Sequence, residues 1–71
     1  MAKKNAKTFG QNLCKLRVEA DLTQEKLAEK ADISRRYVQL IEAGQYTPTI
    51  EIAAKLRAAL DTTWEKLLKG L

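Results

Sequence analysis

The 71-residue sequence predicts an all-α fold of five short helices. Apolar residues recur at spacings of three and four, the period of one helix face, and no stretch alternates as a strand would. Hydroxyl residues precede the helical segments, where they can cap the free N–H groups of a helix. Glycine and proline separate two of the segments. A chain of this size forms a single small domain whose core is only just large enough.

The first helix is expected to begin at Thr8, which can cap its N-terminus. Gly10 counts there as a mild defect, because glycine weakens a helix by up to about 1 kcal/mol relative to alanine. Arg17 lies on the apolar stripe, where a charge is costly unless it is paired. The full stripe consists of Phe9, Leu13, Leu16, Arg17 and Ala20.

Two helical patterns separated by a short break lie within residues 23–43. Thr23 can cap the first pattern and Ser34 the second. The break at residues 31–33 is as short as the turn of a helix-turn-helix, in which the second helix enters the DNA major groove. The positions expected to face the core are Leu27, Ala28 and Ala31, followed by Tyr37, Val38 and Ile41.

The outward face of the second pattern carries side chains suited to reading DNA bases. At about 100° per residue, Arg36 lies near the centre of this face. Arg35 and Gln39 lie to one side of it and Leu40 to the other. Arginine pairs with guanine, glutamine pairs with adenine, and an apolar group can meet the thymine methyl. A merely solvated face usually mixes Glu and Lys, so we predict sequence-specific binding of double-stranded DNA through these four residues.

Two further helices complete the chain. Residues 43–48 combine a glycine past a helix end with a proline ahead of the next helix. Thr62 or Thr63 is expected to cap a short final helix that reaches Lys69. Thr49 is expected to cap the fourth helix, with core positions Ile50, Ala53, Leu56 and Leu60.

Residues 1–7 carry three of the 13 basic residues and none of the nine acidic ones. They lack apolar periodicity, which predicts a flexible basic arm ahead of a domain spanning residues 8–71. The arm either reaches DNA phosphates or is a solvated tail, and three lysines do not decide between these roles. The rest of the chain is nearly neutral, so its affinity for DNA must come from local placement of charge.

The motif and its flanks resemble the Cro/repressor-type helix-turn-helix regulators of phages and bacteria, the XRE family. The resemblance implies a five-helix, lambda-repressor-like DNA-binding domain. It includes both Cro-like repressors and the small controller proteins of restriction–modification systems, and the sequence does not choose between them. The matching residues are Leu13, Leu16, Arg17, Leu22 to Gln24, Leu27, Ala28, Ser34, Tyr37, Val38, Ile41, Glu42, Gly44, Pro48 to Ile50, Leu56, Ala59, Leu60 and Trp64.

The resemblance also implies contacts to the DNA backbone. Carried over residue by residue, it assigns phosphate contacts to Gln24, Ser34, Gly44 and Gln45. Helix N-termini accept phosphate through their free N–H groups, which suits the first two of these positions. The sequence departs from the family at Asp32, where the turn often has glycine. Aspartate tolerates the left-handed conformation better than most residues, so the turn can form.

A structural ion pair between Arg17 and Glu42 is a further implication of the resemblance. It would tie the first helix to the second helix of the motif and satisfy the charge on the apolar stripe. The alternative is an exposed arginine whose aliphatic stem alone packs on the core.

The C-terminal region carries more apolar surface than one short helix needs to dock on its own domain. Trp64 and Leu67 are expected to cover the core. The residues left for contact between two subunits are Ile52, Leu68 and Leu71. A symmetric homodimer would place two reading helices about 34 Å apart and read a palindromic operator. The alternative is a monomer that pairs only on DNA.

No catalytic activity, cofactor or metal site is expected, because the sequence has no histidine, one cysteine and no glycine-rich phosphate loop. No export signal or membrane-length apolar run is recognisable, so a cytoplasmic protein is expected. No ligand-sensing domain is recognisable either, and no small-molecule effector is expected. The alternative function is a protein-interaction module of the coactivator or antitoxin type, against which the arginine-rich face argues.

Overall fold

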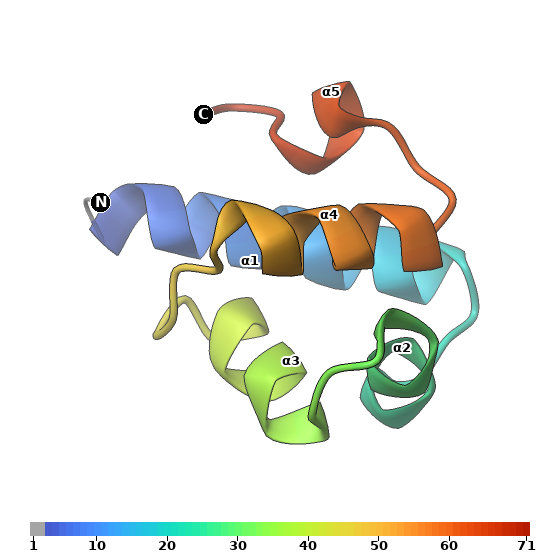
Figure 1. Ribbon diagram of the computed structural model, residues 1–71. Coiled ribbons are helices and arrows are strands. Elements are labelled where there is room, and N and C mark those ends of the chain that lie inside the picture. Colours follow the sequence, from blue (N-terminus) through green and yellow to red (C-terminus); the bar gives the residue numbers. More distant parts are fainter. Residues whose placement is uncertain (1–2) are drawn as a thin grey trace.

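Five helices follow one another in the computed structural model, which describes residues 3–71 (Figure 1). Helices α2 and α3 lie together on one side of α1 and α4, and α5 lies on the other side. No strand occurs within the described residues, and the predicted all-α fold is confirmed. The bounds are α1 Lys3–Glu19, α2 Gln24–Ala31, α3 Arg35–Glu42, α4 Ile50–Ala59 and α5 Trp64–Leu67.

Four of the helices begin at a hydroxyl residue that the sequence indicated as a cap. In each case the side-chain oxygen accepts a hydrogen bond from the backbone N–H three residues later. Such a cap stabilises a helix by about 1 kcal/mol, because it satisfies a donor that has no partner inside the helix. The caps, with the length of each hydrogen bond, are Thr23 (3.0 Å), Ser34 (3.2 Å), Thr49 (3.1 Å) and Thr63 (3.2 Å).

Helix α1 begins at Lys3 rather than at Thr8. The predicted flexible arm is therefore corrected for residues 3–7, which form the first turns of this helix, while residues 1–2 lie outside the described part of the chain. The reason is Ala6, which continues the stripe of Phe9 and is only 5% exposed. Burying this side chain favours a longer helix, and lysine and alanine are good helix formers.

One hydrophobic core is shared by all five helices. Phe9 at one end of it is 4% exposed, and each helix contributes at least one side chain that is completely shielded from water. The completely buried side chains are Leu13 from α1, Leu27 from α2, Val38 and Ile41 from α3, Leu56 from α4 and Leu67 from α5.

Helix α4 packs on the core through Ala53, Leu56 and Leu60 as predicted, but the predicted core position Ile50 is wrong. Ile50 is 84% exposed, whereas Ile52 is half-buried and packs against the core. At 100° per residue, Ile52 lies only about 40° around the helix from the buried Leu56, and Ile50 lies about 120° away. Ile52 is thus withdrawn from the predicted contact between subunits, and Ile50 is the apolar residue that this helix exposes.

Helix α1 lies against the backbone at the end of α3 at Gly10, which is buried. A Cβ atom at this position would overlap the carbonyl oxygen of Ile41 and lie 3.0 Å from that of Glu42. The glycine that the sequence presented as a mild defect is therefore what allows the two backbones to touch.

Candidate nucleic-acid interface

The turn between α2 and α3 sets the direction of α3. Asp32 ends α2 with φ 56° and ψ 47°, in the left-handed region, and its N–H points to the carbonyl groups of Ala28 and Glu29. Two residues later Ser34 caps α3. The expectation that aspartate can form this turn is confirmed, and α2 and α3 have the arrangement of a helix-turn-helix.

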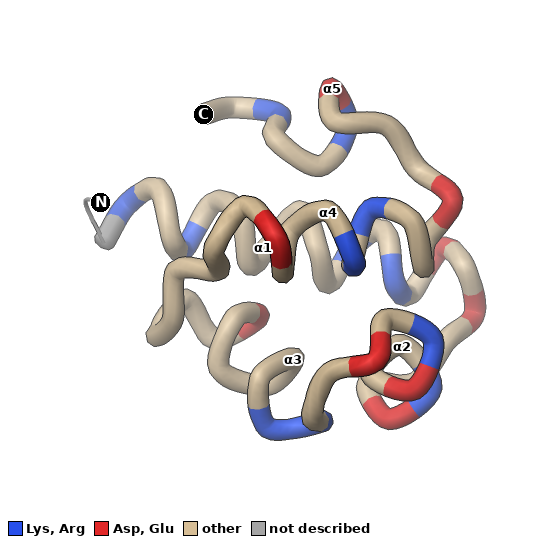
Figure 2. Tube along the Cα trace, viewed as in Figure 1, with Lys and Arg blue, Asp and Glu red and all other residues tan. Residues whose placement is uncertain are grey.

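Helix α3 packs one side against the core and presents the other to solvent. Arg35 and Arg36 are exposed, and Gln39 and Leu40 are half-buried. Figure 2 shows the basic positions at the start of α3, the end that lies away from α1. In a helix-turn-helix the N-terminal residues of the second helix contact base edges. The two exposed guanidinium groups therefore occupy the part of α3 that is suited to reading DNA.

The ion pair between Arg17 and Glu42 is present in the structure. Arg17 Nε donates to Glu42 Oε2 at 2.7 Å, and Nη2 donates to Oε1 at 3.2 Å. The third nitrogen, Nη1, donates to the carbonyl oxygen of Leu22 at 2.8 Å. The hydrogen bond to Glu42 raises the pKa of Arg17 above its ordinary value, so the guanidinium group stays charged. It fastens the C-terminal end of α3 to α1 and to the loop before α2.

Gln24, a predicted phosphate contact, joins the same network. Its Nε2 donates to Glu42 Oε1 at 3.0 Å. A glutamine amide has two N–H donors, so one remains for another acceptor. A polar hollow of about 430 Å³ at the start of α2 brings Gln24 and Arg35 to one place. Its lining residues are Arg17, Thr23, Gln24, Glu25 and Arg35.

The loop after α3 uses its backbone groups inside the protein. Gly44 has φ 73°, in the left-handed region that favours glycine. Its N–H donates to Ile41 at 3.0 Å, and the N–H of Gln45 donates to Leu40 at 2.9 Å. Gly44 therefore ends α3 and has neither a free N–H nor a side chain for the phosphate contact predicted for it. Gln45 keeps an exposed side chain.

Tyr37 is a candidate interface residue that the sequence reasoning missed. It was expected in the core, yet it is 39% exposed. Its ring lies against Tyr46, with 5.1 Å between the ring centroids and 38° between the planes. At 100° per residue, Tyr37 lies about 100° around α3 from Arg36, on the border between the two faces, so periodicity alone does not assign it to either.

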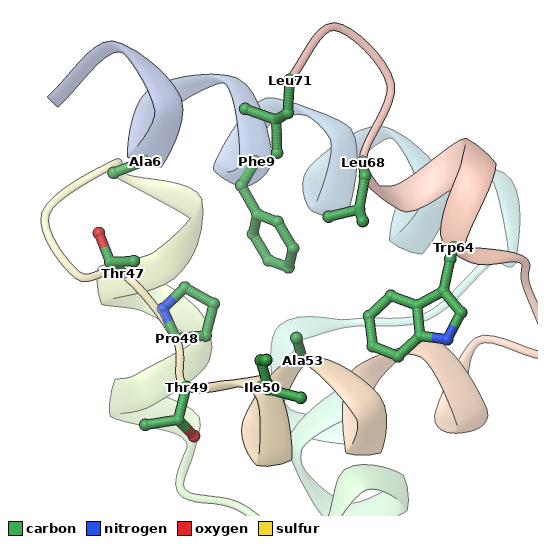
Figure 3. A pocket seen from close by; sticks show the side chains of 10 residues that line it. All are labelled: Ala6, Phe9, Thr47, Pro48, Thr49, Ile50, Ala53, Trp64, Leu68 and Leu71. Carbon is green, nitrogen blue, oxygen red and sulfur yellow. The ribbon is translucent and has the colours of Figure 1, made fainter. Parts of the chain in front are cut away.

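A second exposed surface lies around an apolar hollow of about 380 Å³ (Figure 3). Leu68 and Leu71, two of the predicted contacts between subunits, line it and are 40% and 49% exposed. Trp64 lines it as well and is 41% exposed, so it covers the core less than expected. The complete lining consists of Ala6, Phe9, Thr47, Pro48, Thr49, Ile50, Ala53, Trp64, Leu68 and Leu71.

The described residues offer no comparable arrangement for a metal. No group of three or more metal-binding side chains occurs within residues 3–71. Cys14 is half-buried and accepts a long contact from Arg17 Nη2 at 3.8 Å. None of the helices in this range has the length and apolar character needed to cross a membrane.

Comparison with known proteins gives consistent relatives. A family model described as helix-turn-helix matches residues 15–67. The immunity repressor protein of Bacillus phage phi105 is 42% identical over 53 residues, which are 75% of this chain and 37% of that protein, so the chain spans little more than a third of it. The uncharacterized HTH-type transcriptional regulator y4dJ of Sinorhizobium fredii is 32% identical over 62 residues, 87% of this chain and 80% of that one.

A solved structure shares the whole fold. The crystal structure of the restriction-modification controller protein C.AhdI from Aeromonas hydrophila superposes with a TM-score of 0.87 at 36% sequence identity. The match covers 90% of this chain and 97% of that chain, so the two chains share one fold over nearly their whole lengths.

Proposed function

Because the chain belongs to the helix-turn-helix family of DNA-binding transcriptional regulators, we propose that it reads a palindromic operator as a homodimer. The observation that carries this proposal is α3. Its N-terminal half presents Arg35 and Arg36 to solvent, and its C-terminal end is held by the ion pair between Arg17 and Glu42. A helix held at one end and exposed at the other suits insertion into the major groove.

Base reading is assigned to the exposed arc of α3. Arg36 lies nearest its centre, so it is the strongest candidate for a bidentate contact to guanine. Arg35 and Gln39 extend the arc on one side. Leu40, on the other side, offers an apolar contact to a thymine methyl group. Each good bidentate contact is worth about 1–3 kcal/mol of discrimination between bases.

Backbone contacts are assigned to residues that flank the groove entrance. Gln24 has a free amide N–H at the start of α2, beside the polar hollow. Ser34 lies at the N-terminus of α3, where the helix dipole favours phosphate. Gln45 follows the end of α3 with an exposed side chain. Phosphate contacts position the protein on DNA and carry no direct sequence information.

The homodimer is assigned to the apolar hollow and its rim. Ile50, Leu68 and Leu71 surround it and are extensively exposed, and monomeric proteins seldom leave such clusters uncovered. One domain measures 28 × 23 × 20 Å. Two copies side by side can therefore separate equivalent helices by about 34 Å, one turn of DNA. A single recognition helix reads only a few base pairs, so pairing is what gives a long operator.

Selection of bound sequences from random duplex DNA tests the proposal. Wild-type protein should enrich a site with two-fold symmetry, and Arg36→Ala should bind it about 1–3 kcal/mol less tightly and lose preference at one base of each half-site. Gln24→Ala should weaken all sequences alike. Lys15→Ala, a change of an exposed basic residue on α1, is the matched control and should keep the preference. Failure of the wild type to enrich any sequence would overturn the proposal and favour a protein-binding module.

A further inference from the structure

The residues that follow α5 need a hold on the domain other than their own burial. Residues 68–71 form a turn after the four residues of α5, and we call them the C-terminal turn. A helix as short as α5 does not persist in water without tertiary contacts. Leu67 is completely buried, but Leu68 and Leu71 are 40% and 49% exposed. Burial therefore anchors the end of α5 and leaves the course of the C-terminal turn to other contacts.

Asn12 of α1 holds this turn through its side-chain amide. Its Nδ2 donates to the carbonyl oxygen of Leu67 at 2.9 Å and to that of Lys69 at 2.8 Å. An amide nitrogen carries two N–H donors, and both are used here. The carbonyl of Leu67 lies at the end of α5, where it has no partner inside the helix. The two hydrogen bonds hold the backbone before and after Leu68.

The rest of the C-terminal turn brings Leu71 back toward Leu68. The N–H of Leu71 donates to the carbonyl oxygen of Leu68 at 3.0 Å, and Gly70 has φ 85°, in the left-handed region. A Cβ atom at Gly70 would lie 3.4 Å from Cγ2 of Thr8, so this part of the turn also lies against α1. Both leucine side chains consequently line the apolar hollow (Figure 3).

Asn12 itself does not line the apolar hollow. It is half-buried and lines a separate polar hollow of about 240 Å³, together with Lys15, Glu19 and Lys66. Its link to the apolar hollow is therefore the C-terminal turn that it holds.

The start of α5 is held independently of Asn12. The guanidinium carbon of Arg57 lies 5.6 Å from the ring centroid of Trp64, a cation–π contact. Arg57 Nη1 also donates to the carbonyl oxygen of Thr62 at 3.3 Å. Loss of Asn12 should consequently free the C-terminal turn without undocking α5.

We infer that Asn12 is a positioning residue for the pairing of two copies: it holds the C-terminal turn so that Leu68 and Leu71 meet the second copy in a fixed arrangement. This inference rests on the homodimer of the proposed function. Without the two hydrogen bonds of Asn12 the turn would sample other courses, and pairing would have to order it once in each subunit. Freedom that is already removed in the monomer does not oppose association, which strengthens pairing.

Sedimentation equilibrium without DNA tests the inference. Asn12→Ala should raise the dissociation constant of the dimer roughly tenfold, since a competent fraction of about one third enters once for each of two subunits. Asn12→Asp should raise it at least as much, because an ionised carboxylate cannot donate to the two carbonyl groups. Gln11→Ala, at an exposed neighbouring position on α1, is the matched control and should pair as the wild type does.

Amide hydrogen exchange separates positioning from general stability. It is measured in an Ile50→Glu background, where a charge beside the apolar hollow opposes pairing. In this background Asn12→Ala should speed exchange at Leu68 and Leu71, because the turn opens locally. Exchange at the completely buried Leu13 should keep its rate. Faster exchange at Leu13 as well would mean general destabilisation and would overturn the positioning role, as would unchanged exchange in the turn.

The fluorescence of Trp64, the single tryptophan of the chain, reports on the start of α5. In the same background its emission wavelength should not change with Asn12→Ala, and a shift would show that α5 itself has undocked, against the inference. A wild type that stays monomeric defeats the homodimer and this inference together. A wild-type dimer whose strength Asn12→Ala leaves unchanged defeats the inference alone.

Discussion

At the scale of single residues, Glu42 is the side chain that joins three helices of the candidate interface. Its two carboxylate oxygens accept hydrogen bonds from Arg17 and Gln24, so one side chain at the end of α3 holds α1 and the start of α2. The side chain of Glu42 is 7% exposed and that of Arg17 is 15% exposed. Because both charged groups are largely shielded from water, each relies on the other for its stabilisation.

We therefore expect Glu42→Gln to lower the free energy of unfolding by about 3 kcal/mol, the low end for breaking a buried ion pair. Urea denaturation measures the change. The matched control is Glu29→Gln, which breaks a surface pair with Lys26 in which both side chains are more than 60% exposed. An exposed pair of this kind contributes less than about 1 kcal/mol. Equal losses in the two variants would contradict the structural role of Glu42.

Gly10→Ala tests the close approach of α1 and α3. Helix propensity alone predicts that alanine stabilises α1 by about 1 kcal/mol. The added methyl group would instead meet the carbonyl groups of Ile41 and Glu42, and overpacking of this kind costs about 1–3 kcal/mol. We expect a net destabilisation and weaker operator binding, because the end of α3 must shift. An increase in the thermal midpoint would show that the two helices do not touch as described.

At the scale of helices, α1, α2 and α4 are each followed by an aspartate in the left-handed conformation. These residues are Asp21, Asp32 and Asp61, with φ of 59°, 56° and 50°. Each places a negative charge near the negative end of a helix dipole. We therefore expect each helix end to become more stable when its aspartate is replaced by a neutral residue that also tolerates positive φ.

Asp32→Asn should raise the free energy of unfolding by about 0.3–1 kcal/mol, because asparagine accepts the same backbone conformation without the charge. Asp32→Ala is the control and should destabilise the protein, since its side chain disfavours positive φ. Differential scanning calorimetry compares the two. A lower midpoint for Asp32→Asn would mean that the carboxylate has a favourable partner.

The helices differ in how far the sequence determines them. The caps at Thr23, Ser34 and Thr49 were predictable because a cap is a local interaction within four residues. The exposure of Ile50 was not, since spacing of three or four is satisfied by more than one face of α4 and the choice depends on how the helix docks. The role of Gly10 depends on Ile41 and Glu42 at the end of α3, 31 and 32 residues away along the chain, and no local pattern indicates it.

The candidate site likewise has some features that the sequence predicts and others that it does not. Periodicity placed Arg35 and Arg36 on the exposed arc, and family resemblance supplied the partner of Arg17. Tyr37 lies on the border between the two faces of α3, so its exposure depends on Tyr46, which comes from the following loop. The resemblance assigned a phosphate contact to Gly44. Only the folded chain shows that its N–H donates to the carbonyl oxygen of Ile41 instead.

At the scale of the whole molecule, the prediction concerns pairing of two copies. Ile50→Glu should leave a monomer of 8.0 kDa at micromolar concentration, whereas the wild type should sediment at about twice this mass. The reason is that a charge beside the apolar hollow would be buried without a partner on pairing. Val18→Glu is the control, because Val18 is 61% exposed on α1 and does not line the hollow. Sedimentation equilibrium without DNA gives the masses, and a wild-type monomer would rule out the stable dimer.

The fastening of α3 at its C-terminal end has a consequence for how such proteins diversify. Glu42 fastens the C-terminal end of α3, whereas Arg35 and Arg36, which we propose to select the DNA sequence, lie near the other end of the helix. Because holding α3 in place and the proposed base reading rely on different residues, substitutions at the proposed reading positions leave the packing of α3 intact. After gene duplication, a copy can acquire a new operator through a few surface changes, and both copies keep the same architecture while regulating different promoters.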